Sequence, residues 1–308
     1  MPISIYASVH KSTCDIPGTD VGGGLNRAAE AAGKLYFGTA TNSEQWNDTT
    51  YFDILRSSEF GQITAANVMK WFATEPSPGH NCVWHSQLPD WVANGTFTPE
   101  ELAFVVERHC STLVRHYRGH VWDVINEPFN DDGTFRSDVF FDTLNTTYIP
   151  IALHAARARI RTRSSTSMTS ISRVLATALK NLVKTLQKEH VPIDGVGIQS
   201  HLIVGQVPDT FLQNLQEFTA LGIEVALTEL DIRFEALPPT AEGVAQQKKD
   251  YETVIAACKA VKSASGSRVR AQYSWIPGTF AGQGSACPWD ENFVRKSAYF
   301  GIIDAFGA

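Results

Sequence analysis

The chain has 308 residues, of which 43% are hydrophobic and 19% charged, so it can bury a large core. Its net charge of -6 and pI near 5.8 supply no basic surface for nucleic acid, and no apolar stretch is long enough to cross a membrane. These properties favour one large α/β domain over two ordinary domains, with a neutral or cationic substrate.

The N-terminal segment, residues 1–23, reads as a leader or linker ahead of that domain. It has neither the positively charged start nor the apolar core of a secretory signal, so export cannot be inferred from it. Three N-glycosylation triplets begin at Asn47, Asn94 and Asn145. They are compatible with a secreted glycoprotein, although such triplets also arise by chance.

Helix-like and strand-like segments alternate along the rest of the chain. An alanine-rich helix ends at Gly33, and Thr98 opens a later helix with a capping sequence. The predicted elements are helix 25–33, strand 34–40, strand 60–71, helix 98–117, strand 121–127, helix 138–157, helix 175–190, strand 193–201, helix 208–221, strand 225–231 and helix 241–261. This order predicts a parallel sheet with helical crossovers, and its length suits a (β/α)8 TIM barrel.

Two glutamates, Glu127 and Glu229, lie at the ends of two of these strands. Both strands are apolar and β-branched, as buried parallel strands are. Barrel enzymes place their chemistry where strands end, and glycoside cleavage needs two carboxylates, one to protonate the leaving oxygen and one to attack or to activate water. Taken singly, either residue is equally well explained as a strand-end carboxylate in a surface salt bridge.

Six motifs then occur in one order along the chain. They lie at 61–71, 83–89, 122–127, 194–202, 228–231 and 273–277. In this arrangement the chain resembles family 10 of the glycoside hydrolases, the retaining endo-β-1,4-xylanases, and is most similar to the fungal members. The resemblance covers 24–308, and it implies one catalytic barrel over that range.

The resemblance implies catalytic roles for four residues. Glu127 matches the general acid/base, and Glu229 matches the nucleophile that forms a covalent glycosyl-enzyme. Asn126 matches the amide that binds the sugar 2-hydroxyl. His201 matches the imidazole beside the nucleophile, although a lone histidine at a strand end is more often a core residue.

The resemblance also implies a sugar-binding cleft. Sugar rings stack their C–H faces on indoles, while their hydroxyls need fixed donors and acceptors. The residues that match are Asn67, Lys70, His85 and Gln199 for the hydroxyls, and Trp84 and Trp275 for the aromatic floor. The implied partner is xylan or a xylo-oligosaccharide bound by an extracellular monomer, with no cofactor, metal, nucleic acid or membrane.

Three segments depart from the family pattern. Residues 75–79 lead directly into residues 80–84, whereas family members carry a helix and the start of the third strand between them. A parallel crossover needs at least about a dozen residues, so the connection here is too short for a normal crossover. Residues 160–172 are rich in serine and threonine, and residues 263–268 in serine, where the fifth and eighth strands belong. Reading family-like codons one base late produces both stretches. We therefore expect a barrel that is incomplete or irregular at its third, fifth and eighth strands.

Three functions remain open on this evidence. The first is an active endo-xylanase, the second is a catalytically impaired relative that only binds polysaccharide, and the third is a related barrel hydrolase acting on cellulose or mannan. The five cysteines show no metal-binding spacing. Cys82 and Cys110 are a candidate disulfide pair.

Overall fold

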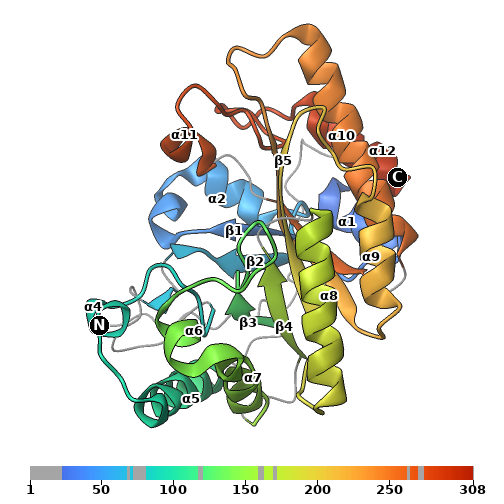
Figure 1. Cartoon of the computed structure of the whole chain (residues 1–308). Helices are drawn as coiled ribbons and strands as arrows, with labels where there is room; N and C mark the ends of the chain where they lie inside the picture. Colours follow the sequence, from blue (N-terminus) through green and yellow to red (C-terminus); the bar gives the residue numbers. More distant parts are fainter. Residues whose placement is uncertain are drawn as a thin grey trace.

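The protein folds around one parallel β-sheet (Figure 1). The computed structural model describes residues 23–67, 70–71, 81–116, 121–158, 163–168, 172–261, 264–269 and 274–307. Its strands are β1 (Phe37–Thr41), β2 (Gln62–Ala65), β3 (Val121–Asn126), β4 (Arg163–Met168), β5 (Gly195–Ile203), β6 (Glu224–Arg233) and β7 (Ala264–Val269). The strand order is β2-β1-β7-β6-β5-β4-β3, so the first strand pairs with the last.

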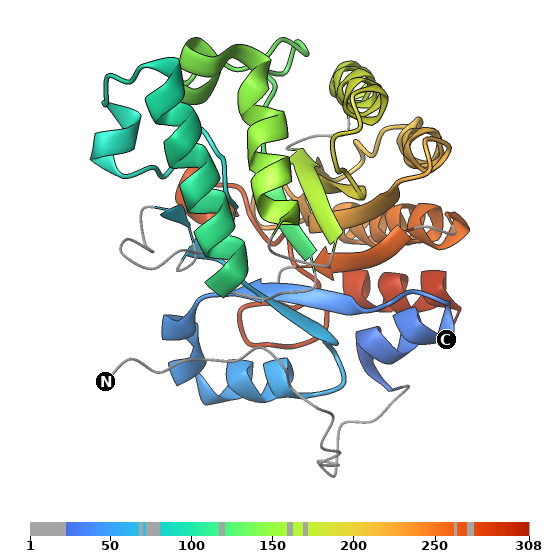
Figure 2. The same cartoon turned by 90° about the horizontal axis from the view of Figure 1, so that it is seen from below.

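Helices surround this sheet in chain order. Figure 2, seen from below, shows them succeeding one another around the central strands from the blue N-terminal helices to the red C-terminal one. The helices are α1 (Gly24–Ala31), η1 (Ser43–Asn47), α2 (Thr49–Arg56), α4 (Asp90–Ala93), α5 (Pro99–His116), α6 (Val139–Leu144), η3 (Asn145–Thr147), α7 (Tyr148–Arg157), α8 (Arg173–Lys188), α9 (Phe211–Thr219), α10 (Ala241–Ala260), α11 (Ile276–Thr279) and α12 (Ser297–Phe306). Because α12 packs on both α10 and α1, the first and last described helices lie side by side.

Apolar patterning explains why these elements pack as they do. In α8 the buried residues Leu175, Leu179, Leu182 and Leu186 recur every three or four positions, which gives the helix one apolar face. Strand β5 is instead buried on both faces along most of its length. Continuous burial of this kind is typical of a parallel strand covered by helices.

A buried carboxylate ties the two ends of the fold together. Glu59, in the loop before β2, accepts hydrogen bonds from the Leu25 backbone N–H at 3.0 Å and from the Tyr299 hydroxyl at 3.0 and 3.1 Å. It also forms an ion pair with Arg295. These contacts join the start of α1 and the loop before β2 to the last helix.

Two expectations from the sequence are corrected by the structure. The predicted helix 138–157 is interrupted at Asn145, whose φ of 52° is incompatible with a continuous helix, so α6, η3 and α7 replace it. Cys82 and Cys110 are buried free thiols rather than a disulfide. Burial, together with a hydrogen bond from Cys82, raises the pKa of the Cys110 thiol.

The three irregular segments have different outcomes. β4 and β7 occupy the fifth and eighth strand positions, so strands are present where the polar composition argued against them. The pairing of β6 with β7 shifts register twice. The third position is held by a single parallel bridge between Val83 and Ile125, and the segment just before it, 72–80, lies outside the described residues.

No described helix is both long enough and apolar enough to span a membrane.

Candidate active site

Glu127 is the first residue after β3, and the backbone there is unusual. The register of β3 against β4 shifts between Asp123 and Ile125, so one extra residue bulges out of the strand shortly before the glutamate. Such bulges bend a strand and redirect the side chains that follow. Glu127 itself has a φ of 52°, a left-handed conformation that costs a non-glycine residue about 1–2 kcal/mol.

The Glu127 carboxylate is held by hydrogen-bond donors on both oxygens. The indole N–H of Trp84 donates to Oε2 at 2.9 Å, and the side-chain amide of Gln199 donates to Oε1 at 3.2 Å. The Asn126 amide lies 3.4 Å from Oε1, and His85 Nδ1 lies 3.8 Å from Oε2. The glutamate side chain is 13% exposed, so it is oriented by its neighbours yet reachable from solvent.

Glu229 lies within β6, directly after another bulge. Ile198 of β5 pairs with Leu227, but the next residue, Gln199, pairs with Glu229, so Thr228 is the extra residue. The Glu229 carboxylate is 24% exposed and lies 3.3 Å from His201 Nε2. Both predicted catalytic strands therefore contain a bulge within three residues upstream of their glutamate.

His201 joins Glu229 to a second carboxylate. Its Nδ1 lies 2.9 Å from Asp231 Oδ2, and the Trp275 indole N–H donates to the same oxygen at 3.1 Å. Burial alone lowers the pKa of His201, but the charges and hydrogen bonds of Asp231 and Glu229 outweigh it and raise the pKa to about 9. At neutral pH the imidazolium therefore donates from both nitrogens, one to each carboxylate.

This raised pKa predicts a pH-dependent stability. Because the folded-state pKa of about 9 exceeds the unfolded value of 6.5, the contribution of His201 is complete below pH 6.5 and is lost as the pH rises through 9. The shift corresponds to roughly 3 kcal/mol. Denaturant unfolding at pH 6, 8 and 10 should show His201→Gln destabilised at pH 6 and losing less stability than wild type between pH 6 and 10. His154→Gln, at an exposed position on α7, is the control; parallel curves for wild type and His201→Gln would contradict the assignment.

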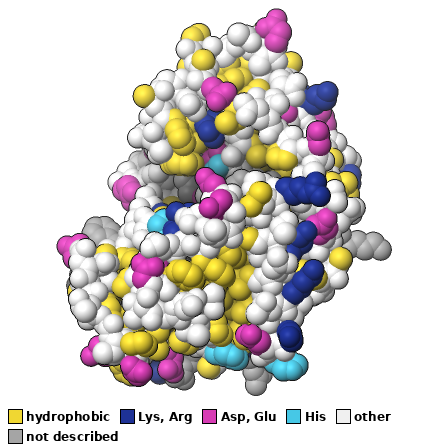
Figure 3. All heavy atoms as spheres, in the orientation of Figure 1, with side chains coloured by type: hydrophobic (Ala, Val, Ile, Leu, Met, Phe, Trp, Pro, Cys, Tyr) yellow, Lys and Arg dark blue, Asp and Glu magenta, His cyan; other side chains and the backbone are white. Residues whose placement is uncertain are grey.

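Gln199 connects the two halves of the site. Its backbone pairs with Glu229 across β5 and β6, and its buried side chain reaches Glu127. Two glutamates that are far apart in sequence therefore lie on either side of one glutamine. Figure 3 shows that this face of the molecule is hollowed, with acidic and histidine side chains gathered at the margin of the hollow.

The remaining predicted residues are distributed unevenly. Lys70 lies over the Trp84 ring, with Nζ 4.5 Å from the ring centroid, so it joins the group around Glu127. Asn67 is exposed, and its backbone N–H bonds to the Asn42 side chain at 2.8 Å. Trp275 belongs to the Glu229 group, where its ring meets the His201 ring edge-on at 4.9 Å.

Sequence reasoning missed Arg136, which contacts the backbone around Glu127. It lies in a predicted loop, and nothing in its immediate sequence marks it. Asp231, which lies against His201, also belongs to the site. Its position two residues after Glu229 on one strand was the available signal, since residues at that spacing share a face. Within the described part of the chain, no cluster of three or more His, Cys, Asp and Glu side chains is arranged to hold a metal ion.

Known proteins share both the sequence and the fold. A sequence model described as Glycosyl hydrolase family 10 matches residues 24–79 and 77–305. Endo-1,4-beta-xylanase A of Phanerodontia chrysosporium is 51% identical over 92% of this chain and 77% of its own, and an endo-1,4-beta-xylanase of Agaricus bisporus is 50% identical over 92% and 94%. A GH10 xylanase from Bispora sp. MEY-1, solved with xylobiose, superposes with a TM-score of 0.85 at 35% identity, covering 92% of this chain and 99% of that one.

The likeness to these structures establishes a (β/α)8 TIM barrel. A barrel with one glutamate directly after β3 and another on β6, each fixed by its own polar neighbours, defines a glycoside hydrolase. The match along most of the sequence makes the assignment specific, because it covers both glutamate strands. The chain belongs to glycosyl hydrolase family 10.

Proposed function

We propose that the protein is a retaining endo-β-1,4-xylanase in which Glu127 is the general acid/base and Glu229 the nucleophile. The observation that carries this proposal is the different surroundings of the two carboxylates. Glu229 lies against the imidazolium of His201, a charge that favours an ionised nucleophile. Glu127 has neutral amide and indole donors at hydrogen-bond distance, as suits a group that exchanges a proton during the reaction.

The reaction proceeds in two displacements. Glu229 attacks the anomeric carbon while Glu127 gives its proton to the departing glycosidic oxygen, so the C–O bond breaks and a glycosyl ester forms. Glu127 then takes a proton from water, whose oxygen attacks the same carbon and releases Glu229. Two inversions retain the configuration, which requires a carboxyl separation of about 5–5.5 Å.

The neighbouring side chains bind the sugar in this proposal. Asn126 is buried beside Glu127 and positions an amide for the 2-hydroxyl, where a hydrogen bond strengthens in the transition state. The hydroxyls on the non-reducing side are bound by Asn67, Lys70, His85 and Gln199, and the sugar faces by Trp84 and Trp275. Xylan as the substrate is supported by relatives named endo-1,4-beta-xylanase at 50–51% identity.

A direct assay distinguishes the three candidate functions. Reducing sugar should be released from xylan, with internal cleavage giving xylo-oligosaccharides and a rapid fall in viscosity. Release of reducing sugar from cellulose or mannan in preference to xylan would identify a related hydrolase instead. Binding to xylan without release of sugar would identify the catalytically impaired relative.

We also propose that the irregular segments reduce stability. The family match divides at residues 77–79, beside the predicted missing crossover, and β4 and β7 carry serine-rich sequences. Each buried unpaired hydroxyl costs about 1–3 kcal/mol, against a total stability of about 5–15 kcal/mol. A variant with family-like sequence restored at all three segments should melt at a higher temperature and cleave xylan faster. Equal melting points and equal rates would refute this.

The domain division and location follow the same reasoning. We assign 24–308 to the catalytic barrel and 1–23 to a leader or linker, and we place the enzyme outside the cell as a monomer. The fungal relatives and the three triplets support an extracellular location, and Asn47, Asn94 and Asn145 are all exposed. Secretion from a fungal host with glycans sensitive to peptide-N-glycosidase tests the location, and sedimentation tests the monomer.

A further inference from the structure

The loop that follows Glu127 folds back on itself as a short hairpin. Phe129 and Phe135 form an antiparallel bridge, and their rings lie 4.7 Å apart. The Phe135 ring also stacks on Phe141 of α6 at 5.3 Å. The hairpin is thereby anchored to a helix, and its returning strand brings residue 136 alongside the catalytic glutamate.

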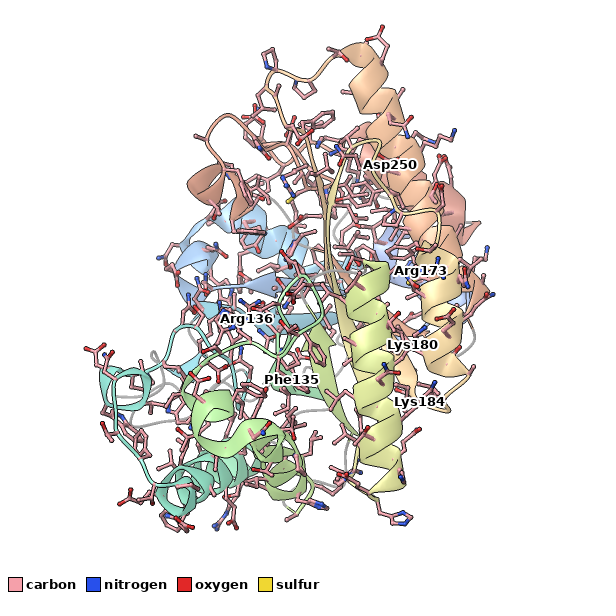
Figure 4. All side chains as sticks on the ribbon, viewed as in Figure 1. Phe135, Arg136, Arg173, Lys180, Lys184 and Asp250 are labelled. Carbon is pink, nitrogen blue, oxygen red and sulfur yellow. The ribbon has the colours of Figure 1, made fainter. Side chains whose placement is uncertain are left out.

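Arg136 binds three consecutive backbone carbonyls at this point. Its backbone N–H donates to the Pro128 carbonyl at 2.9 Å, its Nε–H to the Glu127 carbonyl at 3.4 Å, and its Nη2 to the Phe129 carbonyl at 3.0 Å. Figure 4 labels Arg136 and Phe135 and shows both in the loop region between the sheet and α6. The half-buried side chain thus binds the carbonyls of Glu127 and Phe129, while the backbone N–H binds the carbonyl of Pro128 between them.

One of these hydrogen bonds is made to the residue of the site whose backbone is strained. Glu127 has a φ of 52°, and strained conformations persist only where the surrounding structure enforces them. Without the guanidinium, the two carbonyls lose their side-chain donor, and the peptide planes on which the direction of the Glu127 side chain depends are free to rotate.

We propose that Arg136 is a positioning residue for the acid/base glutamate, because its guanidinium fixes the backbone of Glu127 to Phe129 and so aims the Glu127 carboxyl. The inference rests on the proposed function of Glu127. A misplacement of about 1 Å at a reacting group can cost about 10²-fold in rate.

The charge of Arg136 also acts on the neighbour of Glu127. Burial lowers the pKa of His85, the nearby Arg136 lowers it further, and Glu127 opposes both. Burial raises the pKa of the Asp138 carboxyl, which caps α6, and the backbone N–H groups of Phe141 and Phe140 oppose the rise, with a smaller contribution from the charge of Arg136. The lowered pKa of His85 therefore favours a neutral ring beside Glu127.

Leaving-group dependence separates positioning from simple support of the fold. The constant kcat/KM reports the first displacement, in which an unactivated sugar needs the proton of Glu127 and a dinitrophenyl leaving group does not. Arg136→Met should reduce kcat/KM on xylo-oligosaccharides about 10- to 100-fold more than on 2,4-dinitrophenyl xylobioside. Arg136→Lys should show a loss in kcat/KM between those of wild type and Arg136→Met, since one ammonium group cannot reproduce the planar fork of the guanidinium.

Two further measurements make the outcome decisive. Arg157→Met removes another arginine, the last residue of α7, which pairs with Asp194, and it should change kcat/KM on both substrates by the same factor. A crystal structure of Arg136→Met should show Glu127 leaving the left-handed region. Equal losses on both substrates, or an unchanged Glu127 backbone, would overturn the proposal. Failure of wild type on xylan would instead refute the proposed function, and the crystal structure would still decide the role of Arg136.

Discussion

Glu229→Ala should abolish turnover of every glycoside substrate, activated or not. The variant has no atom to attack the anomeric carbon, so the covalent intermediate cannot form, and kcat should fall at least about 10⁴-fold. The loss should extend to dinitrophenyl xylobioside, because a good leaving group does not replace the nucleophile. Azide fits the space that the carboxylate vacates, and it should restore activity by giving a glycosyl azide of inverted configuration.

The control for this variant is a glutamate just after the end of β6. Glu235, six residues after Glu229, is exposed, and Glu235→Gln should retain wild-type activity. Mass spectrometry after trapping with a 2-deoxy-2-fluoro xylobioside should place the label on the peptide that contains Glu229. A label on another carboxylate, or substantial xylan hydrolysis by Glu229→Ala, would show that the nucleophile has been misassigned.

Glu127→Ala should separate substrates by their leaving groups. Hydrolysis of xylan should fall by about 10²–10⁴-fold, because the departing sugar hydroxyl needs a proton. The first displacement of dinitrophenyl xylobioside should be nearly unaffected, since that leaving group departs as an anion. The glycosyl-enzyme should then accumulate as a burst, and azide should release it as a glycosyl azide of retained configuration.

The matched control is Asp131→Asn, an exposed carboxylate in the hairpin after Glu127. This variant should hydrolyse both substrates at the wild-type rate. If Glu127→Ala lost the same factor on the activated and the unactivated substrate, the proton-transfer role would be wrong. Inverted configuration in the rescued azide product of this variant would count against the double displacement itself.

Local patterns allowed much of the fold to be predicted. The alternation of apolar strands and amphipathic helices predicted the parallel sheet, and β5, β6, α8 and α10 lie close to their expected positions. The prediction was least accurate where backbone conformation depends on a single residue, as at Asn145, which divides one expected helix. Short helices such as α4 and α11, with four residues each, were also missed, because segments of that length carry little periodic signal.

The sequence by itself was enough to propose which residues do the chemistry. Glu127 and Glu229 lie at the ends of two predicted apolar strands, and parallel strands present those ends at one edge of a sheet, so the sequence predicts that the two side chains lie on the same side of the barrel. The placement of Asp231 beside His201 is likewise implied by the two-residue period of a strand.

Only the tertiary structure decided how these residues are aimed and charged. The bulges before both glutamates arise from pairing between strands, and the bond from Gln199 to Glu127 spans 72 residues of sequence. The charge of His201 depends on whether burial or two neighbouring carboxylates dominate, and that balance follows from distances in the folded chain. Arg136 acquires its position from a hairpin closed by ring packing. Local sequence encodes the conformational preference of each segment, whereas these properties depend on contacts between segments, which exist only once the barrel has formed.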